Sequence, residues 1–228
     1  GGRLEIADVQ FPGQTEVLGE RRNRFRRGEP SDQRYDEALP EDYWSPAARA
    51  RRVRAMGLDA AVCFPNFGLL WERRLSTSLP ALKANMGAWN RWCAEVVVPE
   101  GGGAVHPVAH LTLRDPDWLE AQLRSLAKAG VRLAMIAPSL VDGRPLSHPS
   151  LDRAWAAFED SGVMPVFHVA DQPRVFADAW YTDDGDAFVN VLESVFLWTP
   201  PALALADLIL NGVLERHPDL RIGVVELS

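Results

Sequence analysis

The sequence predicts an α/β fold in which helices alternate with short parallel strands. From residue 45 onward, helical segments alternate with apolar runs of strand length, and Gly57, Gly130 and Gly162 each fall between a helical segment and the next run. These runs are apolar at both odd and even positions, as in a parallel sheet covered by helices on both faces. An open doubly wound sheet and a (β/α)8 barrel are the two leading architectures.

Residues 1–44 lack sustained periodicity and contain the arginine-rich run RRNRFRRG at 21–28. We interpret residues 1–44 as an N-terminal arm or loop and residues 45–228 as the α/β domain. A charged run of this kind is most often a solvated surface, and an anion-binding lip is the alternative.

Three later segments have the periodicity and the ends of helices. In DPDWLEAQLRSLAKAG, Asp115 can cap the first turn, Pro116 suits the position after it, and Gly130 can end the helix. In the other two segments, apolar residues repeat at helical spacing before Gly162 and before Pro218: Leu151, Ala154, Trp155 and Phe158, then Leu205, Leu208 and Ile209.

Five apolar runs predict strands at 59–64, 104–110, 131–137, 163–169 and 221–227. A polar or rigid residue stands at the end of each run, and barrel enzymes build their active sites from the carboxyl ends of several strands. The triple glycine at 101–103 precedes a strand, so it is a poor dinucleotide-binding fingerprint. These features favour a (β/α)8 TIM-barrel-like fold, present in part, with about five of its eight units. The residues at the strand ends are Pro65, Asn66, His110, Pro138, His168 and Glu226.

Composition narrows the class of protein. The 24 Lys+Arg against 31 Asp+Glu give a net charge of −7, which argues against nucleic acid as a partner. No apolar run reaches the roughly 18 residues of a membrane span, and the N-terminus does not resemble a signal peptide. The two cysteines cannot supply a disulfide scaffold or a four-thiolate zinc site. We therefore expect a cytoplasmic protein.

The strand-end residues are the candidates for chemistry. His168 can coordinate a metal or transfer protons, and its alternative is a core histidine bonded to backbone. Glu226 can act as a general acid or base, or it can form a salt bridge with an arginine. His110, Asn66 and Trp71 are candidates for lining a substrate pocket, although such tryptophans more often serve packing.

Several segments, taken in order, resemble the amidohydrolase-2 family of metal-dependent barrel enzymes, which includes aminocarboxymuconate-semialdehyde decarboxylase and related hydrolases. The resemblance covers residues 45–228. It rests on AARARRVRAMGLDAAVCFPNFG, KANMGAWNRWC, VAHLTLRDPDWLEAQLRSLAKAGVRLAMIAPS, PLSHPSLDRAWAAFEDSGVMPVFHV and NGVLERHPDLRIGVVELS.

The resemblance implies a distorted (β/α)8 barrel that holds one divalent metal, commonly zinc, at its strand ends. His168 matches a metal-binding histidine of the family. Glu226 stands where decarboxylase members carry a catalytic histidine and many other members carry glutamate. The family's opening DxH or HxH strand and its late SDYPH-like aspartate are not found, and ADVQF has Gln10 where histidine is needed. We therefore expect that sequence is missing at both ends and that the metal site is incomplete in this chain.

The activity that this resemblance implies is metal-assisted, because a bound cation polarises a carbonyl group or lowers the pKa of bound water. We expect hydrolysis of a C–N or C–O bond in a small organic substrate. Nonoxidative decarboxylation of an unsaturated or aromatic acid is the alternative, and a non-catalytic binding barrel without a complete metal site is the second alternative. The expected partner is a small molecule, with no nucleic acid or membrane, and a homo-oligomer is left open.

Overall fold

The computed structural model describes residues 4–11, 27–29, 39–65, 67–168, 175–180, 192 and 195–226. The strands are β1 (Leu4–Ile6), β2 (Val9–Phe11), β3 (Ala61–Cys63), β4 (Val105–His110), β5 (Leu133–Met135), β6 (Met164–His168) and β7 (Gly223–Val225). The α-helices are α3 (Pro46–Ala55), α4 (Trp71–Arg74), α5 (Leu79–Trp92), α6 (Val98–Glu100), α7 (Pro116–Ala129), α8 (Asp152–Ser161), α10 (Thr199–Leu210) and α11 (Val213–Arg216). Short 3-10 turns lie at η2 (Glu41–Tyr43), η3 (Phe67–Leu70), η5 (Pro149–Leu151) and η6 (Asp178–Trp180), and the π-helical turn η4 (Cys93–Val97) joins α5 to α6.

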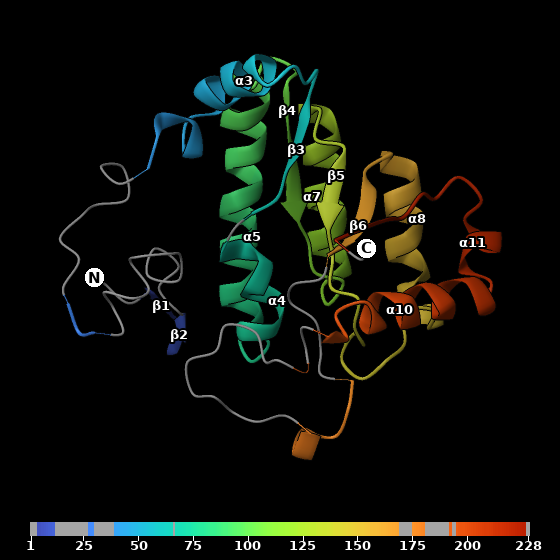
Figure 1. Ribbon diagram of the computed structural model, residues 1–228. Helices are drawn as coiled ribbons and strands as arrows, with labels where there is room; N and C mark the ends of the chain where they lie inside the picture. The colour runs from blue at the N-terminus through green and yellow to red at the C-terminus, as the bar shows by residue number, and fades with distance from the viewer. Residues whose placement is uncertain are drawn as a thin grey trace.

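Strands β3 to β7 form one sheet in the order of the sequence, and every neighbouring pair is parallel. The sheet curls into a half-barrel with helices along its outside (Figure 1). The predicted partial barrel of five strand units is therefore confirmed. Each predicted run contains the observed strand, which is shorter than the run by one to four residues.

The helix ends follow the predicted chemistry. Asp115 accepts a hydrogen bond from the backbone N–H of Trp118 at 3.0 Å and caps α7. Gly130 and Gly162 end α7 and α8 with φ of 91° and 64°, a left-handed conformation that glycine adopts without a steric penalty. These caps direct the chain into β5 and β6.

The main core lies between the sheet and helices α7, α8 and α10. Its largest buried side chains include Trp155 and Phe158 from α8 and Phe167 from β6, each at most 1% exposed. Burial of an apolar side chain of this size contributes about 1.5–3 kcal/mol to stability. The indole of Trp155 also donates to the carbonyl of Leu146 at 2.8 Å, so the core holds the loop that follows β5.

Side chains of α5 complete the pairing of β4. Strand β3 reaches only the first half of β4, since Ala61 pairs with Val105 and Cys63 with Pro107. Beyond that point, the indole of Trp89 donates to the carbonyl of Val108 at 2.9 Å, and the buried amide of Asn90 contacts the backbone of His110, two positions further along the strand. Helix α5 thus supplies partners that the short strand β3 does not reach.

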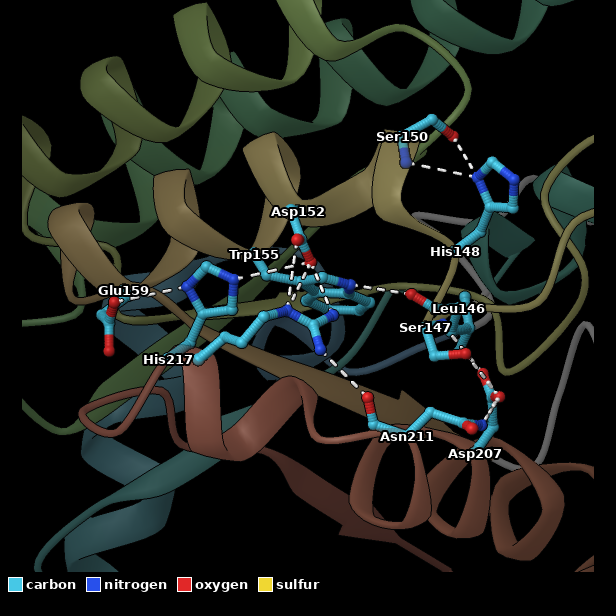
Figure 2. Close-up of polar contacts among 11 residues, drawn as sticks. Leu146, Ser147, His148, Ser150, Asp152, Trp155, Glu159, Asp207, Asn211 and His217 are labelled. Atoms are coloured by element: carbon cyan, nitrogen blue, oxygen red, sulfur yellow. Dashed lines mark hydrogen bonds and ion pairs between the residues drawn. The ribbon is translucent and has the colours of Figure 1, made fainter.

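A polar cluster fastens α8 to α11 and to the residue that follows it (Figure 2). Asp152 pairs with Arg216 at 2.8 Å, and the ring of His217 lies between Asp152 and Glu159, at 3.8 Å and 3.5 Å. His217 is only 8% exposed. His217 precedes Pro218 at the start of a turn, in which its carbonyl accepts from the N–H of Leu220, and its ring lies close to two carboxylates of α8.

Two further features differ from the predictions. Residues 4–11 form a small antiparallel hairpin, whose two turn residues, Ala7 and Asp8, have φ of 50° and 63°, as in a two-residue hairpin turn. The helical segment before Pro218 is two helices, because the chain turns at Gly212 with φ of 70°. Ile209 of the expected apolar stripe is 56% exposed, whereas Leu208 is buried.

Within the described ranges, no helix has both the length and the apolar composition that a membrane crossing requires.

Candidate active site at the carboxyl ends of the strands

His168 and Glu226 lie side by side at the ends of β6 and β7. His168 is the register partner of Val225, so Glu226 follows directly beside it. Nε2 of His168 lies 3.3 Å from Oε2 of Glu226. Glu226 has φ of 58°, a left-handed conformation that is uncommon outside glycine and that ends the strand. The structure thus brings together the two strand-end residues to which the sequence assigned metal binding and catalysis.

The two side chains have different surroundings. The side chain of His168 is 7% exposed, and its ring centroid lies 4.8 Å from that of Phe64. Burial lowers the pKa of His168, and the Glu226 carboxylate offsets part of that effect. The imidazole is therefore neutral at pH 7, the form that binds metals. The Glu226 side chain, by contrast, is 66% exposed.

His110 is buried beneath Trp71 at the end of β4. It is 0% exposed, and the two rings stack at 6.0 Å between centroids with 8° between planes. Burial lowers the pKa of His110 to about 3, although the backbone of Gly68 nearby favours the charged form. In the part of the chain that the structure describes, neither ring nitrogen of His110 nor Nε1 of Trp71 has a hydrogen bond of ordinary geometry. Orphaned buried groups of this kind are costly, and they are found where a ligand, ion or water completes the bonding.

A glycine lets Trp71 reach this position. A Cβ on Gly68 would lie 2.7 Å from Cβ of Pro65 and 3.3 Å from the Trp71 ring, so the turn η3 packs closely only because no side chain is present there. Asn66, the third candidate for lining a pocket, lies outside the described residues.

A second set of polar residues, which was not among the candidates from the sequence, lies at this edge of the sheet. The hydroxyl of Thr112, two residues after β4, donates to Oε1 of Glu72 at 2.9 Å. Burial raises the pKa of Glu72 to about 7, against the lowering effects of Thr112 and of the Arg114 charge. Nε of Arg114 donates in turn to Asp142 at 2.9 Å. Thr112 and Arg114 could have been identified from the sequence, because they closely follow β4, and the position at a strand end is what made His110 a candidate.

A cavity of about 670 Å³ lies beside these residues, between the loop after β5 and the helices α4 and α10. In Figure 1, β4 points downward, toward the end of the sheet at which α10 lies. None of His110, His168, Glu226 or Trp71 lines this cavity. The residues that line it include Glu72, Arg73, Arg114, Asp142 and Asp207, with Pro138, Leu140, Leu146, Pro200, Leu203 and Ala204.

His168 and Glu226 offer one imidazole nitrogen and one carboxylate oxygen, both of them common ligands of divalent metals. Across the described residues, no group of three or more His, Cys, Asp or Glu side chains is arranged to hold a metal ion. His168 and Glu226 therefore do not make up a metal site by themselves, and their geometry does not identify a reaction step that a metal performs.

Comparison with known proteins identifies the family of this chain. The sequence profile of one family, described as amidohydrolase, matches residues 33–227. No curated protein matches the sequence.

Solved structures share the fold. An amidohydrolase from Mycobacterium avium subsp. paratuberculosis K-10 is 24% identical with a TM-score of 0.71, over 89% of this chain and 54% of that chain. A 5-carboxyvanillate decarboxylase from Novosphingobium aromaticivorans, with bound manganese, is 18% identical with a TM-score of 0.57, over 78% and 48%. The 2,6-dihydroxybenzoate decarboxylase from Rhizobium is 19% identical with a TM-score of 0.52, over 82% and 60%.

This chain thus spans about half the length of the solved structures that it matches. At these identities, the structures show a shared fold, and the profile adds the family. A parallel half-barrel with polar residues at its strand ends, matched by that profile over most of its length, belongs to the amidohydrolase family.

Proposed function

We propose that the protein is a metal-dependent hydrolase of the amidohydrolase type, which cleaves a C–N or C–O bond of a small organic substrate. The observation that carries this proposal is the 3.3 Å approach of His168 to Glu226 at the carboxyl ends of two adjacent parallel strands. Barrel enzymes place their catalytic groups at this end.

In this proposal, His168 is a metal ligand and Glu226 transfers the proton. The lowered pKa of His168 keeps its imidazole neutral, as metal binding requires. The exposed carboxylate of Glu226 can accept a proton from a group near His168 and return it to solvent. A divalent metal, with zinc as our first choice, supplies Lewis acidity when it is bound. His110, Asn66 and Trp71 remain proposed substrate-binding residues.

Nonoxidative decarboxylation of an unsaturated or aromatic acid is the second candidate. It is supported by the fold shared with a 5-carboxyvanillate decarboxylase and a 2,6-dihydroxybenzoate decarboxylase, the former of which binds manganese. Glutamate at position 226, where decarboxylase relatives carry histidine, is our reason for placing hydrolysis first. A binding barrel without catalysis is the third candidate.

Metal analysis of the full-length protein tests whether a divalent metal is bound, which both the hydrolase and the decarboxylase require. We expect bound divalent metal in the wild-type protein and a loss of most of it in His168→Ala, with the exposed His106 of β4 as the matched control in His106→Ala. Unchanged metal content in a folded His168→Ala protein would remove His168 from the site. A wild-type protein without metal would favour the binding barrel.

Substrate panels then separate hydrolysis from decarboxylation. Release of labelled carbon dioxide from carboxyl-labelled aromatic acids identifies a decarboxylase, and release of amine or alcohol from amides and esters identifies a hydrolase. A cytoplasmic location and a boundary at residue 44 remain predictions from the sequence, which leaves the oligomeric state open.

A further inference from the structure

The cavity of about 670 Å³ holds a carboxyl group with an unused oxygen. Glu72 lines this cavity, and Oε1 of its carboxyl group accepts the hydroxyl of Thr112 at 2.9 Å. Its Oε2 is buried and has no hydrogen-bond partner among the residues that the structure places. A buried oxygen without a partner is costly, so a site that leaves one open is suited to a ligand that completes it.

The hydrogen bonds around Thr112 decide where a proton on Glu72 lies. The backbone N–H of Arg114 donates to Oγ1 of Thr112 at 3.3 Å, and the single hydroxyl hydrogen of Thr112 points to Oε1 of Glu72. Oε1 is therefore an acceptor, and a proton held by the Glu72 carboxyl group lies on Oε2. Burial raises the pKa of Glu72 to about 7, so this protonated form is well populated at neutral pH.

The charged side chains that line the cavity with Glu72 balance one another. Arg114 donates to Asp142 at 2.9 Å and to the carbonyl of Ser76 at 2.8 Å. Asp207 accepts from the backbone N–H and the hydroxyl of Ser147 at 2.8 Å and 2.7 Å. With Arg73 as the fourth charged residue, two positive and two negative side chains face the cavity when Glu72 is neutral. An uncharged ligand suits this balance.

The rest of the wall is apolar. Leu140 and Leu203 line the cavity and are 64% and 58% exposed, so both leave apolar surface that a ligand in the cavity can cover. Pro138, Leu146 and Pro200 extend the same surface. A ligand with an apolar body would bury these side chains.

We propose that this cavity binds a small uncharged molecule with an apolar body and a carbonyl oxygen, which accepts a hydrogen bond from Oε2 of the protonated Glu72 carboxyl group. The site goes beyond the proposed function, because none of its residues belongs to the pair formed by His168 and Glu226. A carbonyl oxygen has no hydrogen to donate, so it requires a donor on the protein.

This requirement makes binding depend on pH. Ionised Glu72 has acceptors only and repels a carbonyl oxygen, so affinity falls as pH rises through about 7. The groups that face Glu72 are Thr112, Arg114 and Asp142, and Thr112 and Arg114 lower its pKa while Asp142 raises it. For a pKa of about 7, the protonated fraction falls about tenfold between pH 6 and pH 8.

Binding of acetophenone to the full-length protein tests the proposal, with ethylbenzene as the matched probe that lacks the carbonyl oxygen. Whether its exchange is slow or fast, bound acetophenone should transfer magnetisation to methyl groups of Leu140 and Leu203 in NMR spectra. Its affinity should be about tenfold lower at pH 8 than at pH 6. Ethylbenzene should bind more weakly at pH 6 and show no dependence on pH.

Glu72→Gln removes the carboxylate charge at high pH and keeps a hydrogen-bond donor at every pH. Its amide can accept from Thr112 and still donate from the Oε2 position, so the variant should bind acetophenone equally at pH 6 and pH 8. Glu100→Gln, at an exposed glutamate of α6, is the control and should retain the wild-type pH dependence. Wild-type binding that is equal at both pH values, or equal binding of the two probes, would overturn the proposal.

His168→Ala keeps this test independent of the proposed function. The variant should bind acetophenone as the wild-type protein does, even where its metal content falls. Loss of acetophenone binding in a folded His168→Ala protein would show that the ligand occupies the His168 region, and the proposal would then be wrong.

Discussion

The side-chain amide of Asn90 forms hydrogen bonds with both backbone groups of His110. Nδ2 donates to the carbonyl of His110 at 3.0 Å, and Oδ1 accepts from its N–H at 2.8 Å. Nδ2 also donates to Oε1 of Gln122 at 2.9 Å, which ties α5 to α7. A side chain thus takes the place of a neighbouring strand at the carboxyl end of β4, where the candidate site begins.

Replacing Asn90 by alanine should destabilise the fold strongly. The change leaves the buried N–H and C=O of His110 without partners, at a cost of about 2–4 kcal/mol. Urea denaturation measures the loss. Asn85→Ala is the control, because Asn85 only donates to Ala81 within the same helix. Equal losses in the two variants would show that pairing with β4 contributes little.

The buried ring of His110 should make the protein sensitive to acid. Its pKa falls from about 6.5 to about 3 on folding, so the unfolded chain binds more protons below pH 6.5. Stability should therefore fall as pH is lowered from 6.5 toward 3, by up to about 1.4 kcal/mol per pH unit from this group.

His110→Phe keeps a ring against Trp71 and removes the titration, so its stability should fall less steeply over that range. The exposed His106 of the same strand provides the control, and His106→Gln should leave the slope unchanged. Thermal melts at a series of pH values give both slopes. A parallel slope in His110→Phe would exclude His110 as the source.

The strands were predictable because their signals are local. An apolar run bounded by glycine on one side and by a polar residue on the other marks β4, β5 and β6 without any knowledge of the rest of the fold. The pair formed by His168 and Glu226 was predictable for the same reason, because parallel neighbours place their carboxyl ends together.

The cavity was not predictable from such signals. Glu72 lies among charged residues that are typical of an exposed helix, and its burial results from contact with Thr112, forty residues later in the chain. The position of His217 between Asp152 and Glu159 likewise requires α8 and α11 to pack together. Contacts between distant segments depend on how the helices pack, which the spacing of apolar residues does not encode.

Glu72 should give stability a pH dependence of the opposite sign. Its pKa rises from 4.5 to about 7 on folding, so the folded protein binds more protons between these values, and stability should fall as pH rises through them. The loss amounts to about 3 kcal/mol at pH 8. Glu72→Gln should therefore gain stability relative to the wild-type protein between pH 5 and pH 8, measured by denaturant titration. A constant difference between the two proteins would contradict the raised pKa.

Asp152 should contribute modestly to the packing of α8 against α11. It accepts from Nε and Nη2 of Arg216 and lies near His217, but its side chain is 37% exposed, which limits the contribution to about 1 kcal/mol. Asp152→Ala should lose about this amount at low salt and less at high salt. Asp160→Ala, at an exposed residue of the same helix, is the control and should show little change. A loss that does not depend on salt would indicate a packing effect instead.

Glu226→Gln should separate proton transfer from structure. The side chain is 66% exposed at the end of β7, so glutamine can replace it without disturbing the core. If Glu226 takes the proton in the proposed reaction, turnover should fall by at least about 100-fold while the fold and the metal content remain, because glutamine cannot accept a proton at neutral pH. If Glu226 only orients His168 across their 3.3 Å contact, the loss should appear as weaker metal binding. Turnover, metal content and melting temperature, measured on this one variant, distinguish these roles, and full activity with unchanged metal would remove Glu226 from the mechanism.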